Sequence, residues 1–313
     1  MNFIQEKNNK YFNLPLRGKI KKDFSLAPLT WFKVGGKAEI LFEPYDKKDL
    51  IELLRGLKKD IPLYVLGAGS NLLIRDGGIS GIVIKLGKKF CNLNINNNLE
   101  VTVGAGYNCI KLARKLSTLG IGGLEFYSGI PGTVGGAIKM NSGAYQFETS
   151  DRLLEVIALD RNGNTVRLTP KDYKMSYRKS SFSKSYILLE GIYKCELTSK
   201  EKSLDKISKF QKQRTLTQPI KKKTSGSTFK NTKNKKAWEL IKGSGANLLK
   251  VGGAKVSKLH ANFLINNGSS TSADLENLGE EIRNKVRQHF GIQLEWEIKI
   301  IGEKKQYKRY FNV

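Results

Sequence analysis

The chain has 313 residues, of which 39% are hydrophobic and 9% aromatic, and this composition is typical of a folded globular protein and excludes a disordered one. Its 55 Lys and Arg residues outnumber 28 Asp and Glu residues, which gives a formal net charge of +27 at pH 7. No apolar run reaches the roughly 18 residues that a membrane-spanning helix requires.

The first half of the chain alternates predicted helices and strands. Residues 1–22 are expected to form a poorly ordered tail and a basic entry segment. A helix is predicted over 47–59, where leucines recur on one face, and another over 108–119, which Gly120 ends. Strands are predicted in three apolar stretches: residues 63–66, 82–86 and 99–106.

The second half begins with a hairpin signal, because two apolar runs flank Arg161–Asn164. A long helix is predicted from Ser203 to about Pro219, and it forms a natural boundary between an N-terminal and a C-terminal α+β unit. The remaining predicted elements are a strand over 186–197, a helix over 272–290 ended by Gly291, and a strand over 292–300 in which apolar and polar residues alternate.

The most informative stretch is Gly129–Tyr145, which reads GIPGTVGGAIKMNSGAY. Glycine is used where backbone turns at positive φ or approaches a neighbour closely. We interpret this segment as buried backbone that lies along a ligand, and not as a helix or strand that merely happens to contain glycine. A glycine-rich surface loop is the alternative, but apolar residues such as Ile130, Val134 and Ile138 are not expected in a solvated linker.

A second glycine-containing turn, LGAGSNLLIRDGG, occupies residues 66–78 after a predicted strand. It lacks the third glycine of a dinucleotide-binding fingerprint, and the chain has no GxxxxGK[ST] motif, so neither a Rossmann site nor a P-loop is predicted. Such a turn can still present backbone amides to a pyrophosphate. The two glycine-containing segments together predict one large anionic cofactor held at two places.

The positive charge and the cysteines give weaker indications. Lysine runs such as 19–22 and 221–223 lack the interleaved aromatic residues of a nucleic-acid stacking surface. The charge is compatible with nucleic acid, with an anionic small molecule, or with a generally lysine-rich composition.

Cys91, Cys109 and Cys195 lie far apart without CxxC spacing, which predicts no disulfide framework and fits a reducing cytoplasm.

Neither histidine is predicted to act in catalysis. We interpret His260 and His289 as structural, the latter because a cation suits the C-terminal end of a helix. No cluster of His, Cys and carboxylate residues has the spacing of metal ligands, so no metal is predicted.

Seven blocks in order closely resemble bacterial UDP-N-acetylenolpyruvoylglucosamine reductases, and they extend from about Thr30 to Gly302. The blocks are TWFKVGGKAE (30–39), LGAGSNLLIRDGG (66–78), LEFYSGIPGTVGGAIKMNSGAY (124–145), SYRKSSF (176–182), SGSTFKN (225–231), VGGAKVSKLHANFLIN (251–266) and LEWEIKIIG (294–302). Any one of these blocks would be weak evidence, whereas seven in sequence identify a member of the family.

The resemblance implies an α+β fold in which two subdomains form a vanillyl-alcohol-oxidase-type FAD-binding fold and a third domain binds the substrate. It implies a tail over 1–22, FAD-binding subdomains over 23–89 and 90–202, and a C-terminal substrate domain over 203–313. The implied reaction reduces the enolpyruvyl ether of a UDP-sugar to a lactyl ether in peptidoglycan precursor synthesis. NADPH passes a hydride to non-covalently bound FAD, the flavin passes it to C3 of the substrate, and a serine protonates C2.

The same resemblance assigns roles to individual residues. Ser227 in SGSTFKN would be the proton donor, Arg178 in SYRKSSF would hold the substrate carboxylate, and Glu297 in LEWEIKIIG would be the catalytic glutamate. A planar guanidinium suits a carboxylate better than an ammonium does. Substrate contacts are expected from Tyr177, Lys230 and Asn231. Cofactor contacts are expected from Gly67, Ala68, Gly69, Ser70, Asn71, Leu72, Gly129, Ile130, Pro131, Gly132, Thr133, Gly135 and Gly136.

Each of these side chains also has an ordinary structural interpretation. Ser227 could be a serine of a polar turn, Arg178 one surface arginine among many, and Glu297 part of a solvated strand face. Tyr177 could belong to the core. Where many relatives have proline after FKN, this chain has Thr232, which leaves the shape of the following loop open.

Two other functions are considered. A different oxidoreductase on the same flavin-binding scaffold would not need SGSTFKN followed by LEWEIKIIG. A basic nucleic-acid-binding protein would bind without flavin and weaken steeply with salt. We expect a monomeric cytoplasmic enzyme whose partners are a UDP-sugar and NADPH, with neither nucleic acid nor a membrane as partner.

Overall fold

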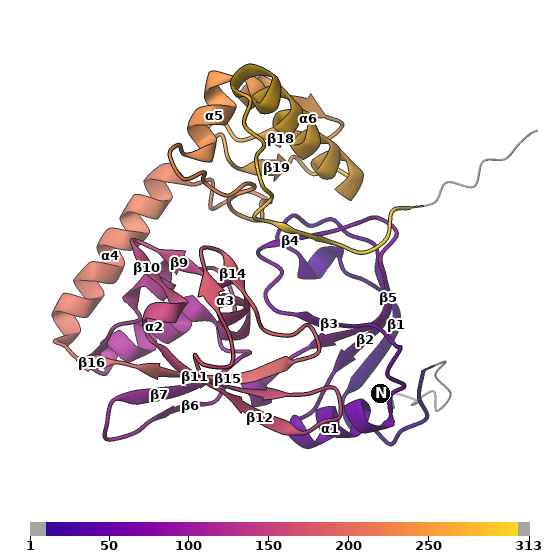
Figure 1. Ribbon diagram of the computed structural model, residues 1–313, viewed down its shortest axis with the longest axis vertical. Coiled ribbons are helices and arrows are strands. Elements are labelled where there is room, and N and C mark those ends of the chain that lie inside the picture. Colours follow the sequence, from indigo (N-terminus) through magenta and orange to yellow (C-terminus); the bar gives the residue numbers. More distant parts are fainter. Residues whose placement is uncertain (1–10, 306–313) are drawn as a thin grey trace, which may run out of the picture. The chain divides into compact units, whose positions relative to one another are not determined.

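The computed structural model describes residues 11–305, which divide into two compact units (Figure 1). Unit 1 comprises the described residues up to Lys21 together with Ile40–Gly67 and Gly81–Gln213. Unit 2 comprises Lys22–Glu39, Ala68–Ser80 and the described residues from Arg214 onward. The division into 23–89, 90–202 and 203–313 stays a prediction.

Unit 1 contains an antiparallel five-stranded sheet with the order β12-β11-β15-β7-β6. Its predicted hairpin is confirmed, because β11 pairs with β12 across the turn at Arg161–Asn164. Two helices belong to the same core as this sheet. The elements are β6 (Leu93–Ile95), β7 (Glu100–Gly104), β11 (Leu153–Leu159), β12 (Thr165–Leu168), β15 (Ile187–Lys194), α2 (Cys109–Thr118) and α3 (Val134–Met140).

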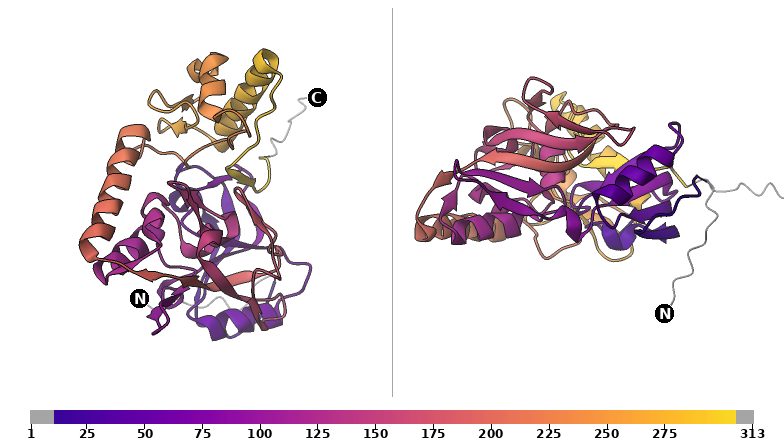
Figure 2. Two further views of the ribbon diagram at one scale, coloured as in Figure 1. Left: turned by 60° about the vertical axis from the view of Figure 1, so that its left-hand side comes forward. Right: turned by 90° about the horizontal axis from the view of Figure 1, so that it is seen from below.

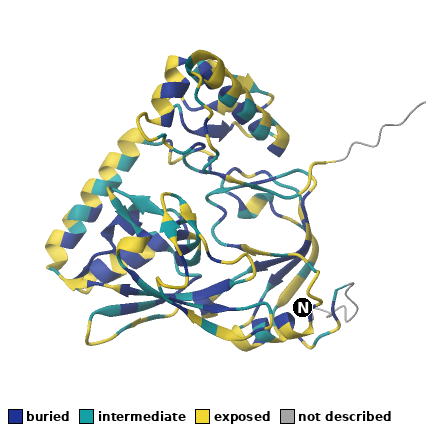
Figure 3. Cartoon of the chain, in the orientation of Figure 1, coloured by how far each residue is buried: buried dark blue, intermediate teal, exposed yellow. Residues whose placement is uncertain are grey.

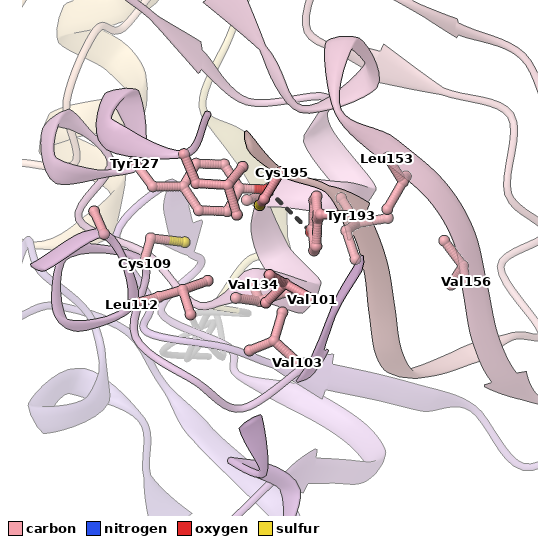
Figure 4. Close-up of a cluster of buried hydrophobic side chains, with 14 of the residues drawn as sticks. Val101, Val103, Cys109, Leu112, Tyr127, Val134, Leu153, Val156, Tyr193 and Cys195 are labelled. Atoms are coloured by element: carbon pink, nitrogen blue, oxygen red, sulfur yellow. Dashed lines mark hydrogen bonds between the residues drawn. The ribbon is translucent and has the colours of Figure 1, made fainter. Parts of the chain in front are cut away.

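The core of this sheet and its helices holds a pair of buried tyrosines (Figure 4). The Tyr127 hydroxyl donates to the Tyr193 hydroxyl at 3.1 Å, and both rings are fully buried. Burial raises the pKa of the Cys195 thiol to about 12 and also raises the pKa of the Cys109 thiol. Both thiols therefore stay protonated at neutral pH, which fits their place among the buried apolar side chains.

A second sheet has the order β1-β2-β5-β3, and α1 packs in the adjacent core. Phe12 and Leu16 belong to this core, so the entry segment is packed from residue 11 onward, while residues 1–10 lie outside the described part. Phe12 and Leu16 are buried in one core with the leucines of α1. The elements are β1 (Lys19–Ser25), β2 (Lys37–Glu43), α1 (Lys47–Gly56), β3 (Leu63–Leu66) and β5 (Ile79–Lys85).

Three short two-stranded ladders complete the strands of unit 1. Two of them form tight hairpins, and the third pairs β8 with β16. Their bounds are β8 (Ile121–Gly122), β9 (Gly143–Ala144), β10 (Phe147–Glu148), β13 (Met175–Ser176), β14 (Lys179–Ser180) and β16 (Glu196–Leu197).

The long predicted helix is confirmed as α4 (Lys200–Thr217), which begins three residues earlier than expected. Figure 2 shows it as one continuous helix that leads from the residues of unit 1 to those of unit 2. Most of its surface is exposed, and only Ser203 and Ile207 are buried (Figure 3).

Unit 2 is built around α6 (Ser272–Phe290), whose predicted bounds are confirmed. Thr271 caps its first turn, and Gly291 ends it in the left-handed region with φ 69°. The predicted strand over 292–300 is wrong, since only Lys299–Ile301 forms a strand. The other elements are β4 (Leu72–Ile74), α5 (Ala237–Gly243), β17 (Lys250–Val251), β18 (Ala254–Val256), β19 (Leu264–Asn266) and β20 (Lys299–Ile301).

Candidate active site

The two segments predicted to hold the cofactor meet in unit 1. β3 ends at Leu66, and the next residue, Gly67, lies so close to Thr133 that a Cβ on Gly67 would be 2.8 Å from Thr133 Oγ1. Thr133 in turn accepts a hydrogen bond from the backbone nitrogen of Gly136 at 3.3 Å. Glycine at position 67 therefore permits the close approach of the strand end and the glycine-rich segment.

The glycine-rich segment contains helix α3 (Val134–Met140). Thr133 is the N-cap and Asn141 ends the helix with φ 43°. Gly135 packs on Ala105, since its backbone nitrogen donates to the Ala105 carbonyl at 2.9 Å. A Cβ on Gly136, by contrast, would meet only Thr133 Oγ1, at 3.4 Å, so this glycine is not required by packing within the protein.

The remaining predicted residues of this segment lead from the end of a 3-10 helix, η3 (Glu125–Gly129), through a turn to α3. A Cβ on Gly129 would lie 2.6 Å from the Tyr145 ring, and the Gly132 carbonyl accepts from the Cys109 nitrogen at 3.0 Å. Ile130 and Pro131 are half-buried. The hydroxyl of Ser128, just before the turn, is buried and has no hydrogen-bond partner within the described part of the chain. These features fit a segment that lies against a bound group.

Residues Ala68–Leu72, the rest of the first predicted cofactor segment, belong to unit 2. Gly69 has φ +65°, and Ser70 is half-buried beside it. The Asn71 carbonyl accepts from the Lys299 nitrogen at 3.0 Å, and its side-chain nitrogen donates to the Glu297 carbonyl at 3.3 Å. Unit 2 thus brings a predicted cofactor residue and a predicted catalytic residue together.

Ser227 and Glu297 lie in two neighbouring segments of unit 2. The Glu297 nitrogen donates to the Thr228 carbonyl at 2.9 Å, and the Lys230 nitrogen donates to the Glu295 carbonyl at 2.9 Å. Both Ser227 and Glu297 are half-buried, so Glu297 is not on a fully solvated face. The two predicted catalytic residues of this unit are therefore adjacent through backbone hydrogen bonds.

Asn262 holds the loop that carries Ser227, a role that the sequence interpretation missed. Its carbonyl accepts from the Thr228 nitrogen at 2.8 Å, its Oδ1 accepts from the Phe229 nitrogen at 2.9 Å, and its Nδ2 donates to the Phe229 carbonyl at 2.8 Å. Gly226, with φ +81° and open space around its missing Cβ, lets the chain turn immediately before Ser227.

The loop after Phe229 is closed by its own hydrogen bonds. Lys230 Nζ lies 2.9 Å from Glu295 Oε2, and Asn231 Oδ1 accepts from the Ala237 nitrogen at 3.0 Å. The Thr232 hydroxyl donates to the Lys235 carbonyl at 2.9 Å. Thr232 therefore closes the turn by hydrogen bonding.

Arg178 occupies the turn of the hairpin formed by β13 and β14 in unit 1, with φ +56°. Its Nη2 donates to the Gly143 carbonyl at 3.0 Å, and its Nη1 lies 3.7 Å from Glu148 Oε1. The Arg178 side chain is 19% exposed, so it is not an ordinary surface arginine. Tyr177 precedes it and is exposed, which excludes the interpretation as a core tyrosine.

The residues present fit FAD better than a metal. Backbone amides of glycine-containing turns are donors suited to a pyrophosphate, and Gly136 offers backbone that no protein atom crowds. Among residues 11–305 there is no group of three His, Cys, Asp or Glu residues that could hold a metal ion. Within the same range no helix is long and apolar enough to cross a membrane.

Comparison with known proteins agrees with this site. Residues 38–169 match the FAD binding domain family, and residues 218–301 match the C-terminal domain of UDP-N-acetylenolpyruvoylglucosamine reductase. The chain is 49% identical over 292 residues to the reductase of that name from Orientia tsutsugamushi (strain Ikeda), covering 92% of this chain and 96% of the relative. It is 44% identical over 291 residues to that of Parvibaculum lavamentivorans, covering 93% and 94%.

A solved structure gives the same result. The crystal structure of UDP-N-acetylenolpyruvylglucosamine reductase from Thermus caldophilus superimposes with a TM-score of 0.79 at 31% identity, covering 91% of this chain and 99% of that one. The expected α+β fold with an FAD-binding part is confirmed. The chain belongs to the UDP-N-acetylenolpyruvoylglucosamine reductase family and is an FAD-binding oxidoreductase.

Proposed function

We propose that this enzyme uses NADPH to reduce the enolpyruvyl ether of UDP-N-acetylglucosamine to UDP-N-acetylmuramate, a step of peptidoglycan precursor synthesis. The observation that carries the proposal is the arrangement in unit 2, where the segment of Glu297 contacts both Asn71 and the loop of Ser227. The backbone segments of a hydroxyl-bearing and a carboxylate-bearing residue thus lie side by side next to a predicted cofactor residue, which supports a site for reduction followed by protonation.

FAD would be held by the segments 67–72 and 129–136, and when bound it would supply the hydride transfer from NADPH to C3 of the substrate. Ser227 Oγ donates the proton that C2 needs when negative charge develops there. Glu297 is the catalytic glutamate. Arg178 binds the substrate carboxylate and stabilises the charge that spreads onto it.

The proposal also assigns binding roles to segments of the chain. In this proposal residues 23–89 and 90–202 hold FAD through the segments 67–72 and 129–136, and residues 203–313 bind the substrate with help from Tyr177. Lys230 and Asn231 contact the UDP-sugar. The enzyme acts as a monomer in the cytoplasm, with neither nucleic acid nor a membrane as partner.

Absorbance spectroscopy of the purified protein tests the proposal. The protein should carry a flavin spectrum that bleaches when NADPH is added under nitrogen and returns when the enolpyruvyl UDP-sugar follows. A folded protein that cannot be reconstituted with FAD would contradict the cofactor assignment. A spectrum that bleaches but returns only with a different acceptor would favour another oxidoreductase on the same scaffold.

A further inference from the structure

The two-residue turn that carries Arg178 is joined to a second hairpin of unit 1. That hairpin pairs β9 with β10 so that Gly143 and Glu148 lie opposite each other, and its turn residues Tyr145 and Gln146 both have positive φ. Arg178 contacts both members of the pair, through the Gly143 carbonyl at 3.0 Å and the Glu148 carboxylate at 3.7 Å. Two of the groups that hold the guanidinium thus come from one ladder position, and the ring of Tyr177 lies 4.9 Å from its central carbon.

Asn141 fixes this carboxylate. Its Nδ2 donates to Glu148 Oε2 at 2.9 Å and to the Ser176 carbonyl at 3.2 Å, and its Oδ1 accepts from the Ser150 nitrogen at 2.9 Å. Asn141 is 1% exposed. Because one buried amide bonds both Glu148 and the strand that leads into the Arg178 turn, it sets the separation between carboxylate and guanidinium.

We propose that Glu148, held by Asn141, is the positioning residue for Arg178 in substrate reduction. The inference rests on the proposed role of Arg178. A guanidinium has five N–H donors in a rigid plane, so it can keep its contacts to Gly143 and Glu148 while it binds a substrate carboxylate. Glu148 itself touches neither substrate nor reacting atoms, and acts by fixing the plane of the guanidinium.

The test uses Glu148→Gln in the full-length holoenzyme, because glutamine retains the acceptor for Asn141 but loses the charge facing Arg178. We expect the rate of flavin reoxidation by the enolpyruvyl substrate to fall by about ten- to a hundredfold, as for a misplaced catalytic group. Flavin reduction by NADPH and FAD affinity should not change. Glu196→Gln removes the carboxylate of another ion pair in unit 1, with Arg152 at 3.2 Å, and should leave both half-reactions unchanged.

Combining the change with Arg178→Ala separates the two proposals. If Arg178→Ala leaves substrate reduction intact, the proposed role of Arg178 fails. If flavin reoxidation by the substrate is slow in Arg178→Ala but equally fast in Glu148→Gln and Glu196→Gln, only the positioning inference is overturned. A role through Arg178 also requires that Glu148→Gln adds nothing in the Arg178→Ala background. Equal slowing of both half-reactions, or loss of FAD, would show a general structural effect and overturn the inference.

Discussion

The carboxylate of Asp76 accepts hydrogen bonds from the backbone nitrogens of Ser272 and Ala273, each at 2.9 Å, at the first turn of α6. These nitrogens have no partner within the helix, and a negative charge is favoured at this end. A residue that the sequence places in a glycine-containing turn, close to Asn71, therefore also anchors the longest helix of unit 2.

Asp76→Ala should lower the free energy of unfolding by about 1–3 kcal/mol, because two charge-assisted hydrogen bonds are lost. Urea denaturation followed by circular dichroism measures the change. Glu281→Ala, an exposed carboxylate on the same helix, is the control and should change stability by less than about 0.5 kcal/mol. Equal effects of the two substitutions would mean that the cap contributes nothing.

Ser227→Ala should separate the half-reactions of the enzyme. Flavin reduction by NADPH should proceed as in the parent protein, whereas reoxidation by the enolpyruvyl substrate should slow by about a hundredfold or more, the usual contribution of a general acid. Stopped-flow absorbance measures both rates. Ser269→Ala, an exposed serine of unit 2, serves as control. An equal loss in both half-reactions would remove Ser227 from the role of proton donor.

Gly136→Ala tests whether the glycine-rich segment lies along FAD. The apoprotein should be as stable as the parent, or more stable by about 0.5–1 kcal/mol, since alanine is the better helix former and its Cβ has room. FAD should bind at least about tenfold more weakly, a loss of about 1.4 kcal/mol. Fluorescence titration measures the affinity. Gly87→Ala, where a Cβ meets no atom within 4 Å, is the matched control, and unchanged affinity in Gly136→Ala would place FAD elsewhere.

His260 should make stability depend on pH. Burial lowers the pKa of His260, whose Nδ1 accepts from the Asn262 nitrogen at 3.2 Å in the neutral form. The unfolded chain then binds more protons than the folded one, so this stabilisation is present above about pH 6.5 and is lost as pH falls through the lowered folded pKa. In denaturant titrations between about pH 7 and about pH 5, His260→Gln should make the free energy of unfolding depend less on pH. A pH dependence in His260→Gln equal to that of the parent protein would contradict this role of His260.

Local signals predicted much of the fold. The capping residue Thr271 and Gly291 bracket a run of apolar residues at helical spacing, so α6 could be placed from the sequence. The strand over 292–300 failed because its alternation reflects packing: Leu294 and Ile298 are buried in the core of unit 2, although only a single bridge, Phe229 to Trp296, connects the segment before β20. An alternation of apolar and polar residues reflects which side chains are buried, and it does not require that the segment pairs with another strand.

The glycine-rich segment shows a different limit to what the sequence can predict. Glycine is a poor helix former, so two adjacent glycines argued against α3. Thr133 as N-cap was the available signal for the helix, and Asn141, suited to a left-handed end, was the signal for its C-terminus.

Only part of the site could be predicted from the sequence. Motifs supplied Ser227, Arg178 and Glu297, but the contacts that hold them join residues far apart in the chain. Glu148 and Arg178 are one example, and Asn262 and Phe229 are another. Without homologous sequences, no local pattern identifies such pairs.

Four of the seven described non-glycine residues with positive φ lie between positions 141 and 178: Asn141, Tyr145, Gln146 and Arg178. Such conformations cost on the order of 1–3 kcal/mol each and persist only where the surroundings impose them. Selection for thermal stability alone would therefore relax these turns first, for example by introducing glycine. A laboratory lineage evolved for heat resistance without selection for turnover should accumulate changes here, and the resulting gain in stability would be accompanied by a loss of activity.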